Sequence, residues 1–222
     1  MLTAVAALHF GELGRSVEGR PIAAYRFGGA GAPLIVLGGV HGDEPASVAA
    51  VVALAYRLRA CAVDRDEVPV WLIPALNPDG VARGTKNSAR DVDLNRNFPA
   101  RSFSTAHAPG YFPGPAPLSE PESRALAELI ERERVCGVVA VHAPFACVNY
   151  DGPAAAWAEA VAAACGWPAR ADIGYPTPGS LGSWLGLDRG VPILTLELPP
   201  GGIENFRGPA AQALDAAVEF RR

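Results

Sequence analysis

Two residues three positions apart, His41 and Glu44, have side chains and a spacing that suggest metal chemistry. The aliphatic run before them, 34–39, is short and bounded by glycines, which predicts a buried strand. The run after them, 45–58, predicts a helix, because proline suits a first helical turn and Asp43 could serve as the N-cap. Ligands of α/β sheets bind at the carboxyl ends of strands. An imidazole and a carboxylate at this turn would supply two of the three protein ligands of a catalytic zinc ion.

A third ligand is available at the end of another aliphatic run, 136–141, which His142 follows directly. Two nitrogens and one oxygen leave a fourth position open for water, as in catalytic rather than structural zinc sites. Taken alone, His142 would be read as a histidine satisfied within the core, and Glu44 as a partner of the helix dipole. The other two histidines, His9 and His107, stand in polar or irregular contexts and are predicted to lie at the surface.

A carboxylate, Glu197, lies near the end of a further apolar run, 191–198. Taken alone, it would be read as one member of an ion pair with an arginine at the end of the sheet. Its Leu-Glu-Leu context predicts a buried strand, where an unpaired carboxylate is costly, so a specific partner is expected.

The remaining pattern alternates strands with helices, which predicts an α/β fold with a mixed, mostly parallel twisted sheet and helices on both faces. We expect one domain over 1–222. A polar segment, 81–118, separates two of the elements, and so long an irregular loop tends to be functional. Strands are predicted at 22–27 (an edge strand), 34–39, 68–73, 136–141, 147–150 and 191–198, helices at 45–59, 120–134, 154–165 and 210–220, and turns at 14–21 and 77–80.

The composition limits the class of protein. The net charge of −4 gives no electrostatic footprint for nucleic acid or an anionic membrane. No apolar run approaches the roughly 20 residues of a membrane span, and no secretory signal is recognisable, so a cytoplasmic location is expected. The four cysteines, Cys61, Cys136, Cys147 and Cys165, lack CxxC spacing and are predicted to be buried thiols.

Four motifs in order, His41-Gly42-Asp43-Glu44, Asp93-Leu94-Asn95-Arg96-Asn97, His142 and Glu197, resemble those of the zinc carboxypeptidase family (the M14 peptidases). The resemblance covers roughly residues 14–200 and implies that family's fold and one zinc ion. Further segments, at 77–80, 92–99, 146–148 and 174–184, resemble the murein peptide amidase A subfamily. That resemblance implies a cytoplasmic enzyme acting on small peptides, which cuts the γ-D-glutamyl–meso-diaminopimelate bond.

The resemblance also implies a role for each matching residue. His41, Glu44 and His142 match the family's zinc ligands, Glu197 matches its general base, and Asp93 matches the carboxylate that hydrogen-bonds a ligand imidazole. Asn95 and Arg96 match the pair that binds the substrate's free α-carboxylate. Tyr175 matches the family's mobile tyrosine, and Gly182 matches the position that sets side-chain specificity. A guanidinium suits the carboxylate-binding role because it can bind bidentately. A glycine at 182 would leave room for a long, polar side chain.

One position departs from the family pattern. The family usually has an arginine that polarises the scissile carbonyl, and the residue nearest to that position in this sequence is Lys86. A lysine offers a point charge, whereas an arginine offers a planar group with two parallel N–H donors. Either Lys86 fills that role, or Arg90 or Arg83 reaches in from beside it.

Three other functions stay open at this point, and a general carboxypeptidase is one of them. A deacylase of N-acyl amino acids, of the succinylglutamate desuccinylase and aspartoacylase type, has a related metal motif, but the 93–98 and 174–184 segments favour the peptidase-amidase interpretation. A peptide-binding module without catalysis would keep the groove, but the intact ligand set and Glu197 argue against it. A metal other than zinc also suits two nitrogens and one oxygen. The oligomeric state is not readable from the sequence.

Overall fold

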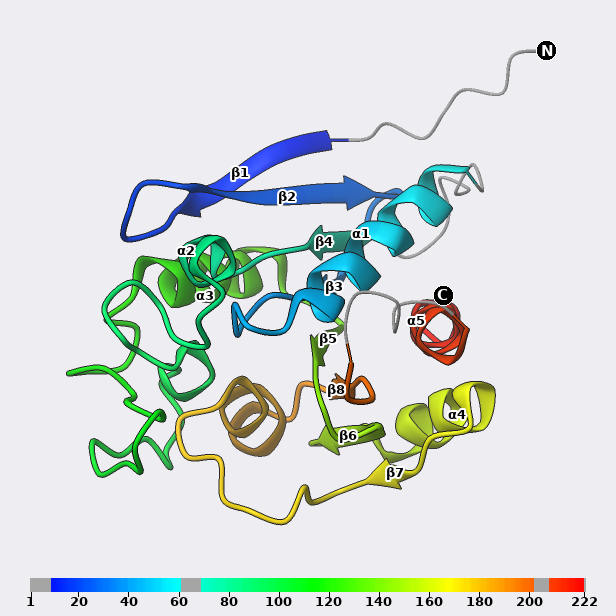
Figure 1. Cartoon of the computed structure of the whole chain (residues 1–222). Helices are drawn as coiled ribbons and strands as arrows, with labels where there is room; N and C mark the ends of the chain where they lie inside the picture. Colours follow the sequence, from blue (N-terminus) through cyan, green and yellow to red (C-terminus); the bar gives the residue numbers. More distant parts are fainter. Residues whose placement is uncertain (1–8, 61–68, 202–207, 222) are drawn as a thin grey trace.

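The computed structural model describes residues 9–60, 69–201 and 208–221, which form an α/β fold around one mixed sheet (Figure 1). Within these residues the sheet has eight strands in the order β1-β2-β4-β3-β5-β8-β6-β7. The strands are β1 (His9–Arg15), β2 (Pro21–Phe27), β3 (Leu34–Leu37), β4 (Val70–Ile73), β5 (Gly137–His142), β6 (Cys147–Asp151), β7 (Ala169–Arg170) and β8 (Ile193–Glu197). The four central strands, β4, β3, β5 and β8, are parallel, whereas β2 and β6 flank them in antiparallel pairings.

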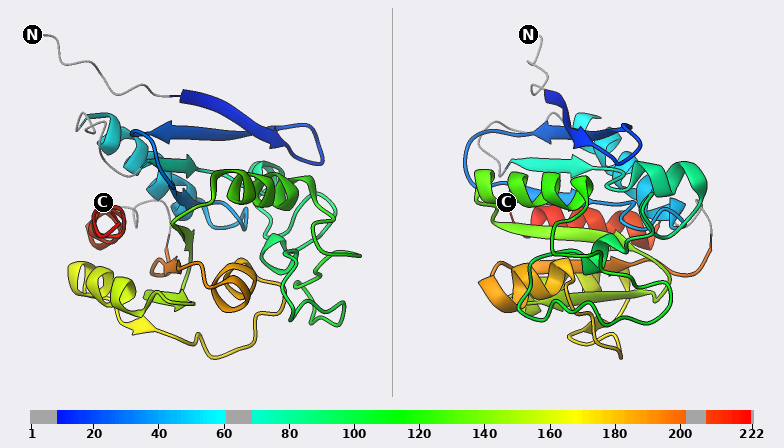
Figure 2. Two further views of the ribbon diagram at one scale, coloured as in Figure 1. Left: turned by 180° about the vertical axis from the view of Figure 1, so that it is seen from behind. Right: turned by 90° about the vertical axis from the view of Figure 1, so that its left-hand side faces the viewer.

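Helices cover both faces of this sheet, as Figures 1 and 2 show. One face carries α1 (Pro45–Ala60), α4 (Ala155–Cys165) and α5 (Pro209–Glu219), whose apolar residues join one buried cluster. The other face carries α3 (Pro121–Glu133) and the short π-helix η2 (Ser183–Leu187). The predicted fold class is therefore confirmed.

The central strands are apolar throughout because both of their faces are covered. In β3, Leu34 and Val36 belong to the cluster beneath α1, whereas Ile35 and Leu37 belong to the cluster beneath α3. The same alternation in β8 places Thr195 and Glu197 on the α3 side. The end of β8 therefore presents a carboxylate on the face where α3 and η2 lie.

Several local predictions are wrong. The strand at 22–27 is not an edge strand, because β1, which lacks a clear apolar alternation, pairs with its outer side. The turn at 77–80 instead opens a helix, α2 (Pro78–Arg83), since Asn77 caps it by accepting a hydrogen bond from the Gly80 amide. A second short element, the 3₁₀-helix η1 (Leu94–Arg96), interrupts the long loop. Helix α1 begins directly after Glu44, so Asp43 is not its N-cap.

The predicted buried thiols are confirmed at Cys147 and Cys165, while Cys136 is half-buried. The fourth, Cys61, lies outside the described residues. Among the helices that the structure describes, none is long and apolar enough to cross a membrane.

The turn that carries His41 is fixed by a close backbone contact with α2. A Cβ atom added at Gly42 would lie 1.9 Å from the carbonyl carbon of Gly80, so no side chain fits there. The Gly42 amide also donates a hydrogen bond to the Lys86 carbonyl oxygen at 3.2 Å. The segment 80–86 therefore sets the path of the chain between His41 and Glu44.

We expect Gly42→Ala to lower the free energy of unfolding by about 2–3 kcal/mol, because two backbones must separate to admit the methyl group. Urea unfolding followed by circular dichroism measures the change. Gly11→Ala is the matched control, since a Cβ at Gly11 meets nothing within 4 Å. A Gly42→Ala protein as stable as the control would contradict the assigned contact.

Candidate active site

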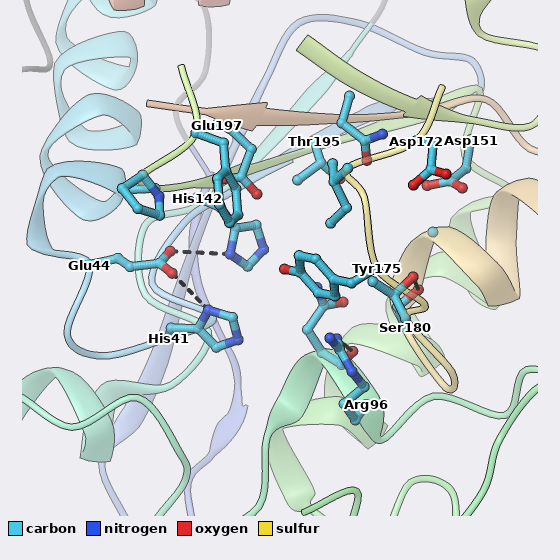
Figure 3. Close-up of a pocket in the computed structure, with 18 of the residues that line it drawn as sticks. His41, Glu44, Arg96, His142, Asp151, Asp172, Tyr175, Ser180, Thr195 and Glu197 are labelled. Atoms are coloured by element: carbon cyan, nitrogen blue, oxygen red, sulfur yellow. Dashed lines mark hydrogen bonds and ion pairs between the residues drawn. The ribbon is translucent and has the colours of Figure 1, made fainter. Parts of the chain in front are cut away.

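The carboxylate of Glu44 lies between two imidazoles (Figure 3). Its Oε1 is 2.8 Å from Nδ1 of His41, and its Oε2 is 3.1 Å from Nδ1 of His142. One ligating atom from each residue can be chosen so that all three lie within 4.8 Å of one another. His41 follows β3, Glu44 precedes α1 and His142 ends β5, so three separate elements bring the three predicted ligands together.

The hydrogen bonding of His41 shows that this arrangement suits a cation. Its Nε2 lies 3.1 Å from Oδ1 of Asp93, a carboxylate that is fully buried. An imidazole that donates its Nε2–H to Asp93 has its lone pair on Nδ1, which faces Glu44. A lone pair and a carboxylate repel each other unless a proton or a metal ion lies between them.

The pKa values of the site reflect the same constraint. Burial lowers the pKa of His41, but Asp93 and Glu44 outweigh it and raise that pKa to about 9. Burial raises the pKa of Glu44, but His142 and His41 outweigh it and lower that pKa to about 2. A metal ion would displace the His41 proton, and two nitrogens with one carboxylate oxygen are a donor set that Zn²⁺ accepts.

Glu197 lies beside this triad and lines the same pocket. It pairs in register with His142 across β5 and β8, and it is only 5% exposed. Its Oε2 atom is buried and accepts no hydrogen bond from any described residue. Burial raises the pKa of this carboxyl, and the neighbouring His142 opposes that rise.

A pocket of about 200 Å³ joins the triad and Glu197 to the other predicted substrate residues. Asn95 and Arg96 line it, and Nη1 of Arg96 donates to the Asn95 carbonyl oxygen at 2.7 Å. The Asn95 side chain accepts a hydrogen bond from the Leu181 amide at 3.1 Å, which ties η1 to the segment before η2. Tyr175, whose side chain is partly exposed, and Gly182 complete the wall.

Of the three candidate cations, the structure brings only Lys86 into this pocket. Its Nζ lies 2.9 Å from Oδ2 of Asp93 and donates to the Gly110 carbonyl oxygen at 3.1 Å. Arg90 is exposed and lies 4.0 Å from Glu120, and Arg83 pairs with Glu18, both outside the pocket lining.

Sequence reasoning missed several residues that line the pocket. Tyr111 comes from the long loop, and the centroid of its ring lies 3.5 Å from Nζ of Lys86 and 5.3 Å from Cζ of Arg96. Asn149 and Asp151 come from β6, and Thr195 from β8. Alternation along 147–151 could have indicated that Asn149 and Asp151 share a face, but it could not indicate which face.

Comparison with known proteins identifies the family. The sequence profile described as zinc carboxypeptidase matches residues 6–156. The chain belongs to the zinc carboxypeptidase family. It is 35% identical to murein peptide amidase A of Escherichia coli (strain K12) over 84% of this chain and 80% of that protein. It is 36% identical to murein peptide amidase A of Vibrio campbellii over 75% of this chain and 69% of that protein.

Solved structures of zinc carboxypeptidase-like proteins share this fold. Murein-tripeptide amidase MpaA from Escherichia coli O157 superposes with a TM-score of 0.76 at 28% identity, covering 99% of this chain and 94% of that one. Thrombin activatable fibrinolysis inhibitor has a TM-score of 0.80 at 17% identity over 96% of this chain and 71% of that one, a likeness of fold alone. The family and the murein peptide amidase relatives together indicate that the present chain is a metallopeptidase or amidase. Its His41, Glu44 and His142 form a possible zinc site.

We expect Asp93→Asn to weaken zinc binding by about 10- to 100-fold, because partners that orient a ligand imidazole typically contribute that much. Competition with a chromogenic chelator measures the affinity. Asp91→Asn is the matched control, since Asp91 is exposed and bonds Asn87 rather than a histidine. Equal zinc affinity in the two variants would argue against the role of Asp93.

Proposed function

We propose that this protein hydrolyses the γ-D-glutamyl–meso-diaminopimelate amide bond of small murein peptides. The observation that carries the proposal is one pocket that holds a metal-ligating triad, a buried carboxylate and a guanidinium in a chain that aligns with most of murein peptide amidase A. The resemblance to that subfamily also leads us to propose the cytoplasm as its location.

The chemistry follows from the positions of the side chains. A zinc ion held by His41, Glu44 and His142 would polarise the scissile carbonyl and make water more acidic. The free Oε2 of Glu197 accepts the proton of the attacking water and passes it to the leaving nitrogen. The raised pKa of this carboxyl favours both steps, since a stronger base accepts the first proton and its conjugate acid can still release it.

The other pocket residues hold the substrate. Arg96 and Asn95 bind the free α-carboxylate of the residue that is released, so cleavage occurs next to a chain terminus. Lys86 stabilises negative charge on the carbonyl oxygen, a role whose loss typically costs about 10²–10³ in rate. Tyr175, at the rim of the pocket, closes over the bound peptide.

We expect Glu197→Gln to keep zinc and fold while kcat falls by about 10²–10⁴, because general acid–base catalysis typically contributes that much. Release of diaminopimelate from L-alanyl-γ-D-glutamyl-meso-diaminopimelate gives kcat, and atomic absorption gives the zinc content. Glu128→Gln, an exposed position on α3, is the control. Unchanged turnover in Glu197→Gln would refute the assignment of the base.

A substrate panel separates the proposed reaction from related ones. We expect the γ-linked murein tripeptide to have a higher kcat/KM than an α-linked C-terminal peptide, N-acetyl amino acids or N-succinyl amino acids. A chelator should abolish cleavage, and one equivalent of zinc should restore it. Preference for the N-acyl amino acids would identify a deacylase instead, and zinc-loaded protein that cleaves nothing would favour a peptide-binding role.

A further inference from the structure

One carboxylate in the pocket, that of Asp151, has no partner among the residues that the structure describes. Asp151 ends β6, lines the pocket and is half-buried. Its side chain makes no hydrogen bond or ion pair with any described residue. Burial raises the pKa of this carboxyl, and within the described part of the chain no cation offsets the rise. Such a group is costly to leave unpaired, so its place in a substrate pocket calls for an explanation.

The sheet directs Asp151 into the pocket. Side chains two apart in a strand share a face, so Cys147, Asn149 and Asp151 project together. These three pair in register with Glu197, Thr195 and Ile193 of β8, respectively. Asp151 therefore lies on the same face as the proposed base, four residues farther along the strand.

Two glycines make the space that this carboxylate occupies. A Cβ atom at Gly182 would lie 2.2 Å from Oδ2 of Asp151, and one at Gly186 would lie 2.5 Å from the Asp151 Cβ. The space that Gly182 leaves is therefore filled by the Asp151 carboxylate, so a substrate side chain that reaches this end of the pocket meets a negative charge. The pocket end at Gly182 is acidic rather than neutral.

The charges of the pocket are separated. Figure 3 shows Arg96 near Tyr175 and well apart from Asp151 and Asp172. Asp172 is exposed, and its Oδ1 accepts a hydrogen bond from the Gly174 amide at 2.7 Å. A ligand that fits both regions carries a carboxylate for Arg96 and, at some distance from it, a positive charge for Asp151.

We propose that Asp151 determines specificity by pairing with an ammonium group on the side chain of the residue that is released. The proposal rests on the proposed function and names the chemical class of that residue as a diamino acid. In meso-diaminopimelate the group would be the distal amine. Hydrogen bonds between charged groups contribute enough to make this contact decisive for substrate choice.

The experiment removes each partner in turn, using zinc-loaded full-length enzyme. The substrates are L-alanyl-γ-D-glutamyl tripeptides ending in meso-diaminopimelate, in lysine, which lacks the distal carboxylate, or in 2-aminopimelate, which lacks the distal amine. The enzymes are the natural protein, Asp151→Asn and the control Asp215→Asn, whose carboxylate pairs with Arg57 away from the pocket. The readout is kcat/KM for each pair, with zinc content and thermal unfolding to verify each variant.

We expect the natural enzyme to cleave the 2-aminopimelate substrate about 10- to 100-fold less efficiently than the two amine-bearing substrates. Asp151→Asn should lose a similar factor on the amine-bearing substrates and little on 2-aminopimelate, whereas Asp215→Asn should change nothing. An equal loss on all three substrates, or none, would overturn the proposal while leaving the proposed function intact. If Asp151→Asn does not fold, the natural enzyme still tests the proposal. Equal cleavage of the three substrates by that enzyme would be enough to overturn the role of Asp151. Failure of the natural enzyme on all three would refute the proposed function instead.

Discussion

The site depends on one carboxylate that two imidazoles share. Glu44 lies 2.8 Å from His41 and 3.1 Å from His142, while Asp93 holds the opposite side of the His41 ring. These contacts are compatible only if a proton or a metal ion separates the histidine nitrogens from the carboxylate. The fold therefore maintains three side chains that need a cation, and two of them, His41 and His142, follow or end strands that are buried on both sides.

Most of the residues around the metal site could be predicted, because they end or follow segments of the sequence with a strong apolar pattern. His142 and Glu197 end aliphatic strands, and His41 closely follows one, so identifying the strands also located the residues. Parallel strands end at the same edge of a sheet, which brought His142 and Glu197 into register. Helices α1, α3, α4 and α5 were also predicted, α3 from the proline and acidic residues at its start.

What could not be predicted depends on contacts between distant segments. β1 has a weak apolar pattern and exists through its pairing with β2, so the sequence alone suggested no strand there. The choice among Lys86, Arg90 and Arg83 depends on the course of an irregular loop, which places Tyr111 against Lys86. The place of Asp151 in the pocket could not be predicted, because it depends on the antiparallel register of β6 on β8. That register decides which residues of β6 share a face with the proposed base.

Strand β6 sets a fixed distance between the proposed base and Asp151. Its first residue, Cys147, lies opposite Glu197, and its last, Asp151, lies opposite Ile193. At a rise of about 3.3 Å per residue, these two positions are about 13 Å apart along the strand. A strand held by hydrogen bonds on both sides cannot stretch, so this length is a fixed property of the sheet. Selection among substrates by the reach of their side chains would therefore require no moving part.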